Sequence, residues 1–199
     1  MPWAELAALL AFATAMTFTP GPNTTLATAL AANHGLRHAL RFVLAVPVGW
    51  GLLMAACALG LGALLQAQPA LRGAIKWGGL AYMLWLAFKL SQSARLAQAD
   101  PARFDVGFAK GVALQFINIK AWMNALLITA GWVMVADPPW ARLALVVPVV
   151  MAFGMFSNLS YALVGSALRG WLAQGQRLLV FNRVLALVLV ATAAWMARL

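Results

Sequence analysis

The sequence predicts an all-α integral membrane protein with six transmembrane helices. Its 199 residues are 64% hydrophobic and only 9% charged, with a mean hydropathy of +0.87, whereas a soluble domain is about half apolar and about a quarter charged. Six apolar segments are long enough to cross a bilayer, which takes about twenty helical residues. They lie at 5–32, 40–66, 71–91, 107–135, 141–167 and 179–197. Because no long polar segment separates them, we expect one transmembrane domain over residues 1–199.

The first apolar segment is interrupted by Pro20-Gly21-Pro22, followed by Asn23 and Thr24. Two prolines and a glycine leave backbone donors and acceptors without helical partners, and hydrocarbon cannot solvate them. Such a break persists only inside protein or beside a wet cavity, and many secondary transporters build substrate sites from discontinuous helices. We therefore expect this break to mark the functional site, where Asn23 and Thr24 either cap the restarting helix or bind substrate.

A second polar interruption, from Gln115 to Asn124, falls within the fourth segment and contains Asn118 and Lys120. Lys120 lies roughly 20 Å from either end of that helix, too far for its side chain to reach the interface. A charge at that depth costs several kcal/mol, so Lys120 should face the protein interior or a wet cavity. Trp122, two residues further on, is the aromatic residue that we place near a substrate.

The partner of Lys120 is left open by the sequence. The chain has four carboxylates, at segment ends or in connections: Glu5, Asp100, Asp105 and Asp137. Lys120 therefore either waits for an arriving anion, such as the carboxylate of a small zwitterion, or acts as a structural cation that binds carbonyls exposed by the first break.

Three spans in each half would make the halves inverted relative to each other, each with an interrupted first helix. We assign the first half to 1–91, a cytoplasmic linker to 92–106 and the second half to 107–199. Nine lysines and arginines fall on the linker side of the membrane: Arg37, Arg41, Lys89, Arg95, Arg103, Lys110, Arg169, Arg177 and Arg183. Four fall on the other side: Arg72, Lys76, Arg142 and Arg198. The positive-inside rule then places both termini outside the cytoplasm.

Several function classes are excluded or disfavoured. The formal charge of +10 is spread over connections and span ends, which favours attraction to membrane lipids over nucleic acid binding. The sequence shows no catalytic arrangement, metal-ligand spacing or cofactor motif, and we read the lone Cys57 as a small apolar residue. A channel is disfavoured because no charge ring or filter-like loop is visible.

Two motifs resemble the lysine exporter (LysE/RhtB) family of bacterial amino acid exporters. One is Pro20-Gly21-Pro22-Asn23; the other runs from Phe108-Ala109-Lys110-Gly111 to Asn118-Ile119-Lys120-Ala121. The segment Trp77–Trp85 is also similar to the third span of that family. Three departures stand out: Ile119 replaces a proline, so the second break should be milder or absent; Ala39 stands where a glycine is frequent; and Val48-Gly49-Trp50 lacks the acidic or polar residue of many relatives.

The resemblance implies a secondary transporter of the bacterial inner membrane that exports amino acids or related small metabolites, by proton antiport. The missing carboxylate favours a neutral substrate over a basic one. The site would comprise Pro20, Gly21, Pro22, Asn23, Thr24, Asn118, Lys120 and Trp122. The alternative is a non-transporting scaffold or accessory subunit that keeps the exporter fold, with Ile119 as a sign of relaxed function. The sequence also leaves a homo-oligomer open.

Overall fold

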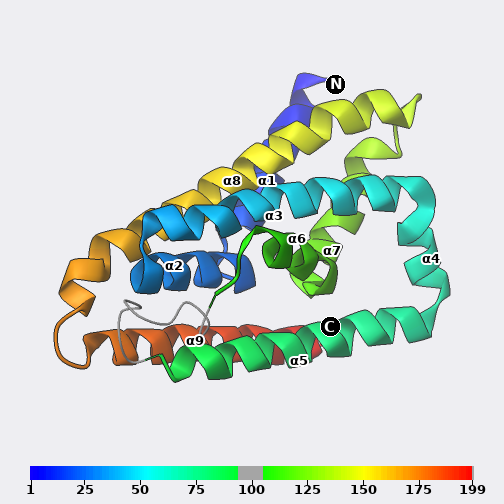
Figure 1. The fold of residues 1–199 in the computed structure, drawn as a ribbon. Helices are drawn as coiled ribbons and strands as arrows, with labels where there is room; N and C mark the ends of the chain where they lie inside the picture. Colours follow the sequence, from blue (N-terminus) through cyan, green and yellow to red (C-terminus); the bar gives the residue numbers. More distant parts are fainter. Residues whose placement is uncertain (94–104, 199) are drawn as a thin grey trace.

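The computed structural model describes residues 1–93 and 105–198, and the described chain is helical without a β-strand (Figure 1). The helices are α1 (Trp3–Phe18), α2 (Pro22–His34), α3 (Leu36–Ala56), α4 (Gly62–Ala67), α5 (Pro69–Ser91), α6 (Phe108–Ile117), α7 (Ile119–Ile128), α8 (Pro139–Leu172) and α9 (Arg177–Ala197). The segment Cys57–Leu61 joins α3 to α4 through a kink at Gly60, whose φ is 104°, and a π-helical turn, Thr129–Val133, extends α7. The all-α class predicted from the sequence is confirmed.

Both predicted breaks are present. The pair α1 and α2 is bent by 52° and the pair formed by α6 and Ile119–Val133 by 71°. The second break is therefore present with Ile119 in place of proline, so the alternative that it is absent is wrong. The bend does not need a proline, because Asn118 is extended and its side-chain oxygen accepts the backbone N–H of Lys120, which caps the new helix.

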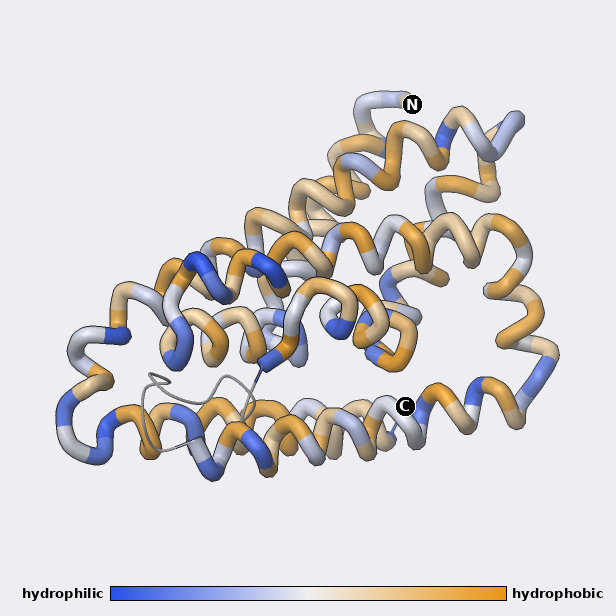
Figure 2. Tube along the Cα trace, in the orientation of Figure 1, coloured by the Kyte–Doolittle hydropathy of each residue, from blue (hydrophilic) through white to orange (hydrophobic). Residues whose placement is uncertain are grey.

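Among the described residues, three helical stretches are long and apolar enough to span a membrane: Leu36–Leu65, Pro139–Leu172 and Arg177–Ala197. The two bent pairs raise this number to five if each crosses as one span. The sixth predicted span, 71–91, does form the 23-residue helix α5. This helix is long enough to span a membrane but is less apolar than the other three, because it contains Arg72, Lys76 and Lys89. The protein is thus a multi-pass membrane protein, and hydrophilic residues gather at helix ends and connections (Figure 2).

Successive connections alternate between two ends of the molecule. The turns between α2 and α3 and between α8 and α9 lie at one end, whereas α4, the connection before α8 and the N-terminus lie toward the other (Figure 1). This alternation is what the predicted topology requires. Most of the predicted linker 92–106, including Arg95, Asp100 and Arg103, lies outside the described residues.

The two breaks lie in the interior of the fold. Helix α2 is buried from Pro22 to Asn33 and packs against α8 and α3, while α6 packs against α3 and α5 runs along α9. Two helices can approach this closely only where a side chain is absent. A Cβ atom on Gly165 of α8 would overlap the carbonyl oxygen of Thr28 on α2. The central packing holds the two breaks next to each other.

Candidate functional site

The first break arises where α1 ends at Phe18 and α2 begins at Pro22. The Thr24 hydroxyl caps the new helix: it accepts a hydrogen bond from the Gly21 N–H (2.9 Å) and donates one to the Gly21 carbonyl (3.1 Å). Of the two roles considered for Thr24, capping is thus the one that the structure displays.

Two carbonyls at the C-terminal end of α1 are bound by side chains of α8. Ser157 donates a hydrogen bond to the Thr17 carbonyl (2.7 Å), and Tyr161 donates one to the Phe18 carbonyl (3.0 Å). Polar groups of a broken helix that cannot reach water need partners inside the protein. Helix α8 therefore stabilises the break.

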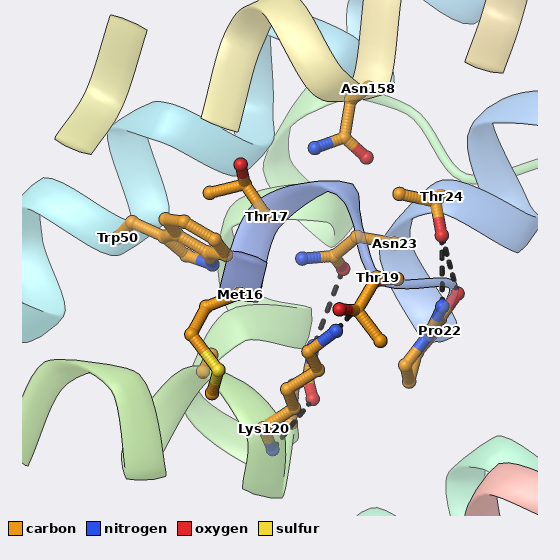
Figure 3. Close-up of a pocket in the computed structure, with 12 residues that line it drawn as sticks. Met16, Thr17, Thr19, Pro22, Asn23, Thr24, Trp50, Lys120 and Asn158 are labelled. Atoms are coloured by element: carbon orange, nitrogen blue, oxygen red, sulfur yellow. Dashed lines mark hydrogen bonds between the residues drawn. The ribbon is translucent and has the colours of Figure 1, made fainter. Parts of the chain in front are cut away.

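Lys120 binds the next carbonyl of the break. Its Nζ donates a hydrogen bond to the Thr19 carbonyl (2.9 Å), and the side chain reaches from α7 to the connection between α1 and α2 (Figure 3). Gly21 leaves room for it, since a Cβ there would lie 3.3 Å from both Cδ and Nζ of Lys120. In the described part of the chain no carboxylate pairs with this ammonium. The contact with a carbonyl is the one expected of a structural cation.

Buried amides join the two breaks. Asn23 and Gln115 exchange hydrogen bonds: the Asn23 Nδ2 donates to Gln115 Oε1 (2.8 Å), and the Gln115 Nε2 donates to Asn23 Oδ1 (3.2 Å). Trp50 Nε1 also donates to Gln115 Oε1 (3.0 Å), and Asn118 Nδ2 donates to Asn23 Oδ1 (3.4 Å). Asn23 is therefore fixed by its amide partners and does not cap α2.

A small polar cavity lies between the breaks, with a volume of about 20 Å³, enough for little more than a water molecule. Thr17, Asn158 and Lys120 are among the residues around it (Figure 3). We call it the central cavity. Six predicted site residues line it: Gly21, Pro22, Asn23, Thr24, Asn118 and Lys120. Trp122 is not among its lining residues; its indole donates to the Phe116 carbonyl (2.7 Å), a carbonyl freed by the second break.

A larger cavity of about 420 Å³ adjoins the central one and is mainly apolar. We call it the outer cavity. It runs along the C-terminal half of α9, from Val188 to Trp195, and Pro20 lines it. Met16, Thr19 and Lys120 line both cavities. These side chains, with the hydrogen bond from Lys120 to Thr19, therefore form the partition between the two spaces.

Comparison with known protein families identifies the family of this chain. The model of the LysE type translocator family matches residues 14–198. The chain belongs to the LysE type translocator family. It is similar to proteins named cysteine/O-acetylserine efflux protein. The protein of Klebsiella pneumoniae is 32% identical over 188 residues, 93% of each chain, and that of Escherichia coli K12 is 33% identical over 175 residues, 86% of this chain and 87% of the relative. The Salmonella choleraesuis protein is 33% identical over 176 residues. No solved structure matches.

Membership of this family makes the protein a translocator and not an enzyme. Four residues of the site were not among the candidates that the sequence analysis chose. Thr17, Trp50 and Asn158 line the central cavity, and Gln115, at the start of the second interruption, accepts hydrogen bonds from Asn23 and Trp50. Gln115 carried a usable signal, because an amide deep in an apolar segment needs a buried partner. Asn158 carried a weaker one, since a mid-span asparagine more commonly bonds a neighbouring helix than lines a site.

Proposed function

We propose that this translocator exports small neutral amino acids and their derivatives, with cysteine and O-acetylserine as the first substrates to test, across the bacterial inner membrane. The observation that carries the proposal is the unpaired cation at the breaks: the Lys120 ammonium lines the central cavity and in the described chain binds only a backbone carbonyl. A substrate carboxylate is a stronger partner than a carbonyl. The names of the relatives support the same substrate class.

The geometry supports one orientation of the substrate. The carboxylate would bind the Lys120 ammonium near the N-terminus of α2, where the helix dipole favours negative charge. The α-ammonium group of the substrate would face Asn158 and Thr17. In the described chain the Oδ1 atom of Asn158 and the Oγ1 atom of Thr17 are buried without a hydrogen-bond partner. An acidic residue would be needed for a cationic side chain, and in the described chain none lines the central cavity.

Export would proceed by alternating access between two inverted halves of three spans each, with α5 as the sixth span beside α9. The outer cavity runs along the part of α9 that leads to the C-terminus, so it would open on the non-cytoplasmic side. Movement of Lys120 away from Thr19 would join the outer cavity to the central cavity. Lys120 is also our candidate for coupling export to a proton gradient.

Counterflow in proteoliposomes tests this proposal. Vesicles loaded with unlabelled O-acetylserine should accumulate labelled O-acetylserine when they contain the wild-type protein, and unlabelled cysteine should compete. The Lys120→Met variant should lose at least about tenfold of this activity, because the charge-assisted bond to the carboxylate is gone. Lys110→Met is the matched control, since Lys110 is exposed on α6. An imposed pH gradient across the same vesicles tests proton coupling.

Two results would contradict the proposal. If wild-type vesicles accumulate no member of a neutral amino acid panel, the scaffold alternative is favoured. If Lys120→Met transports as well as the wild type at equal protein content, Lys120 is a structural cation only. The scaffold alternative was suggested by Ile119 as a sign of relaxed function. The second break is nevertheless present with Ile119 in place of proline, which weakens that argument.

A further inference from the structure

Asn124 on α7 is a buried amide that the breaks do not use. It is 3% exposed, and within the described chain neither its Nδ2 nor its Oδ1 has a hydrogen-bond partner. Asn23, Gln115 and Asn118, the amides at the breaks, are all hydrogen-bonded. A buried amide left without partners is costly, so such a group in a folded protein calls for an explanation.

Asn124 lines a second small cavity beside the central one. Met54, Ile128 and Val150 give this cavity an apolar wall, and its volume of about 10 Å³ holds at most one water molecule. No charged residue of the described chain lines it. We call it the inner subsite. Its chemistry suits an uncharged group that combines a hydrogen-bonding atom with a short apolar end.

Trp50 connects the inner subsite with the central cavity. Trp50 and Ala121 line both spaces. The Trp50 indole N–H is held by Gln115, and its six-membered ring lies close to Gly154, where a Cβ would come within 3.3 Å of the ring. The ring of Trp50 is thus the wall between the two cavities, and a small shift of this ring would join them.

The position of Asn124 relative to Lys120 gives the direction of a bound substrate. The two residues are four positions apart on α7, so they lie on the same face, about 6 Å apart along the helix axis. An amino acid whose carboxylate binds Lys120 can therefore extend its side chain past Trp50 toward Asn124.

We propose that Asn124 determines specificity by binding a hydrogen-bonding group in the substrate side chain, and that this group is the carbonyl of a short acyl ester or amide. When the Trp50 ring moves aside and the two cavities join, the Asn124 Nδ2 donates to that carbonyl, and the terminal methyl or amide group contacts Met54, Ile128 and Val150. The inference rests on the proposed function, because it requires an amino acid held at Lys120.

The test compares two substrates of nearly the same shape. Homoleucine has the outline of O-acetylserine but lacks both ester oxygens, so it leaves Asn124 without a partner. A site that hydrogen-bonds a substrate group discriminates strongly against an analogue that lacks it. In proteoliposomes, wild-type protein should prefer O-acetylserine over homoleucine in competition by at least about tenfold, the worth of one hydrogen bond.

Asn124→Leu should remove this preference while counterflow of alanine, whose side chain is too short to reach residue 124, is unchanged. Asn124→Thr supplies a hydroxyl donor in place of the amide N–H and should retain part of the preference. Thr129→Val is the matched control: the Thr129 hydroxyl is also buried without a partner in the described chain, but Thr129 does not line the inner subsite. Its substrate ratio should equal that of the wild type.

The outcomes separate the two proposals. If wild-type vesicles carry none of these amino acids, the proposed function fails and this inference fails with it. If wild-type vesicles transport O-acetylserine but Asn124→Leu keeps the wild-type ratio, only the assignment of Asn124 is refuted. If Thr129→Val changes the ratio as much as Asn124→Leu, selectivity depends on general packing of α7 and the inner subsite is also refuted.

Discussion

Removal of Gln115 should destabilise the protein more than the loss of any other single side chain at the breaks. Gln115 is completely buried and accepts hydrogen bonds from Asn23 Nδ2 and Trp50 Nε1. In Gln115→Leu both donors stay buried without a partner. Each unsatisfied buried group costs about 1–3 kcal/mol, so the free energy of unfolding should fall by about 2–6 kcal/mol.

A double-mutant cycle with Asn23→Leu tests the same reasoning more sharply. Each single variant leaves one amide without its partner, whereas the double variant replaces the pair with an apolar contact. The loss of unfolding free energy in the double variant should therefore be at least ~1 kcal/mol smaller than the sum of the losses in the two single variants. The Trp50 and Asn118 donors remain unpaired in it, which is why recovery should be partial.

Reversible unfolding by SDS titration in mixed micelles, followed by circular dichroism, measures these differences. Gln68→Leu is the control, because Gln68 is exposed before α5 and its side chain does not cap that helix. A Gln115→Leu protein that unfolds within ~1 kcal/mol of the wild type would refute the argument that this amide network holds the breaks together. Additive single variants would refute the direct pairing of Asn23 with Gln115.

Two further predictions concern helix α8. Gly165→Ala should lower the free energy of unfolding by roughly 1–3 kcal/mol, since its methyl group would overlap the Thr28 carbonyl. The control is Gly170→Ala, where the new methyl group meets open space on the same helix, and it should be near neutral in the same SDS titration. Tyr161→Phe should cost about 0.5–1.5 kcal/mol because the Phe18 carbonyl loses its donor; an unchanged unfolding midpoint would show that this carbonyl needs no donor.

The sequence predicted the first break because its cause is local. Two prolines and a glycine in three successive positions remove amide donors and disfavour a continuous helix, so Pro20-Gly21-Pro22 located the end of α1 and the start of α2 within a residue or two. The same local reasoning did not settle whether the second break is present. There the bend depends on Asn118, which caps α7, and on Trp122, which binds the Phe116 carbonyl. The residue types in this segment do not predict either of these two contacts.

Contacts between distant segments explain what sequence reasoning missed at the site. Asn23 and Gln115 are 92 positions apart, and only the packing of α2 and α6 on α3 brings their amides together. Whether a mid-span polar residue is satisfied, like Gln115, or left without a partner, like Asn124, depends on the neighbours that the fold supplies. The position of a polar residue in the middle of an apolar segment marks it as unusual, but this position does not show whether the residue has a hydrogen-bond partner.

The two roles considered for Lys120 are consistent with one mechanism. The structure has its ammonium on the Thr19 carbonyl, at the negative end of the α1 dipole, where a cation stabilises the broken helix. We propose that a substrate carboxylate, the stronger partner, draws this ammonium away from Thr19 and so opens the partition between the central and outer cavities. Substrate binding and the opening of the exit would then be one exchange of hydrogen bonds. We propose on this reasoning that the structural contact is the resting state of the transport cycle, in which its strength would limit how readily the cavity opens without substrate.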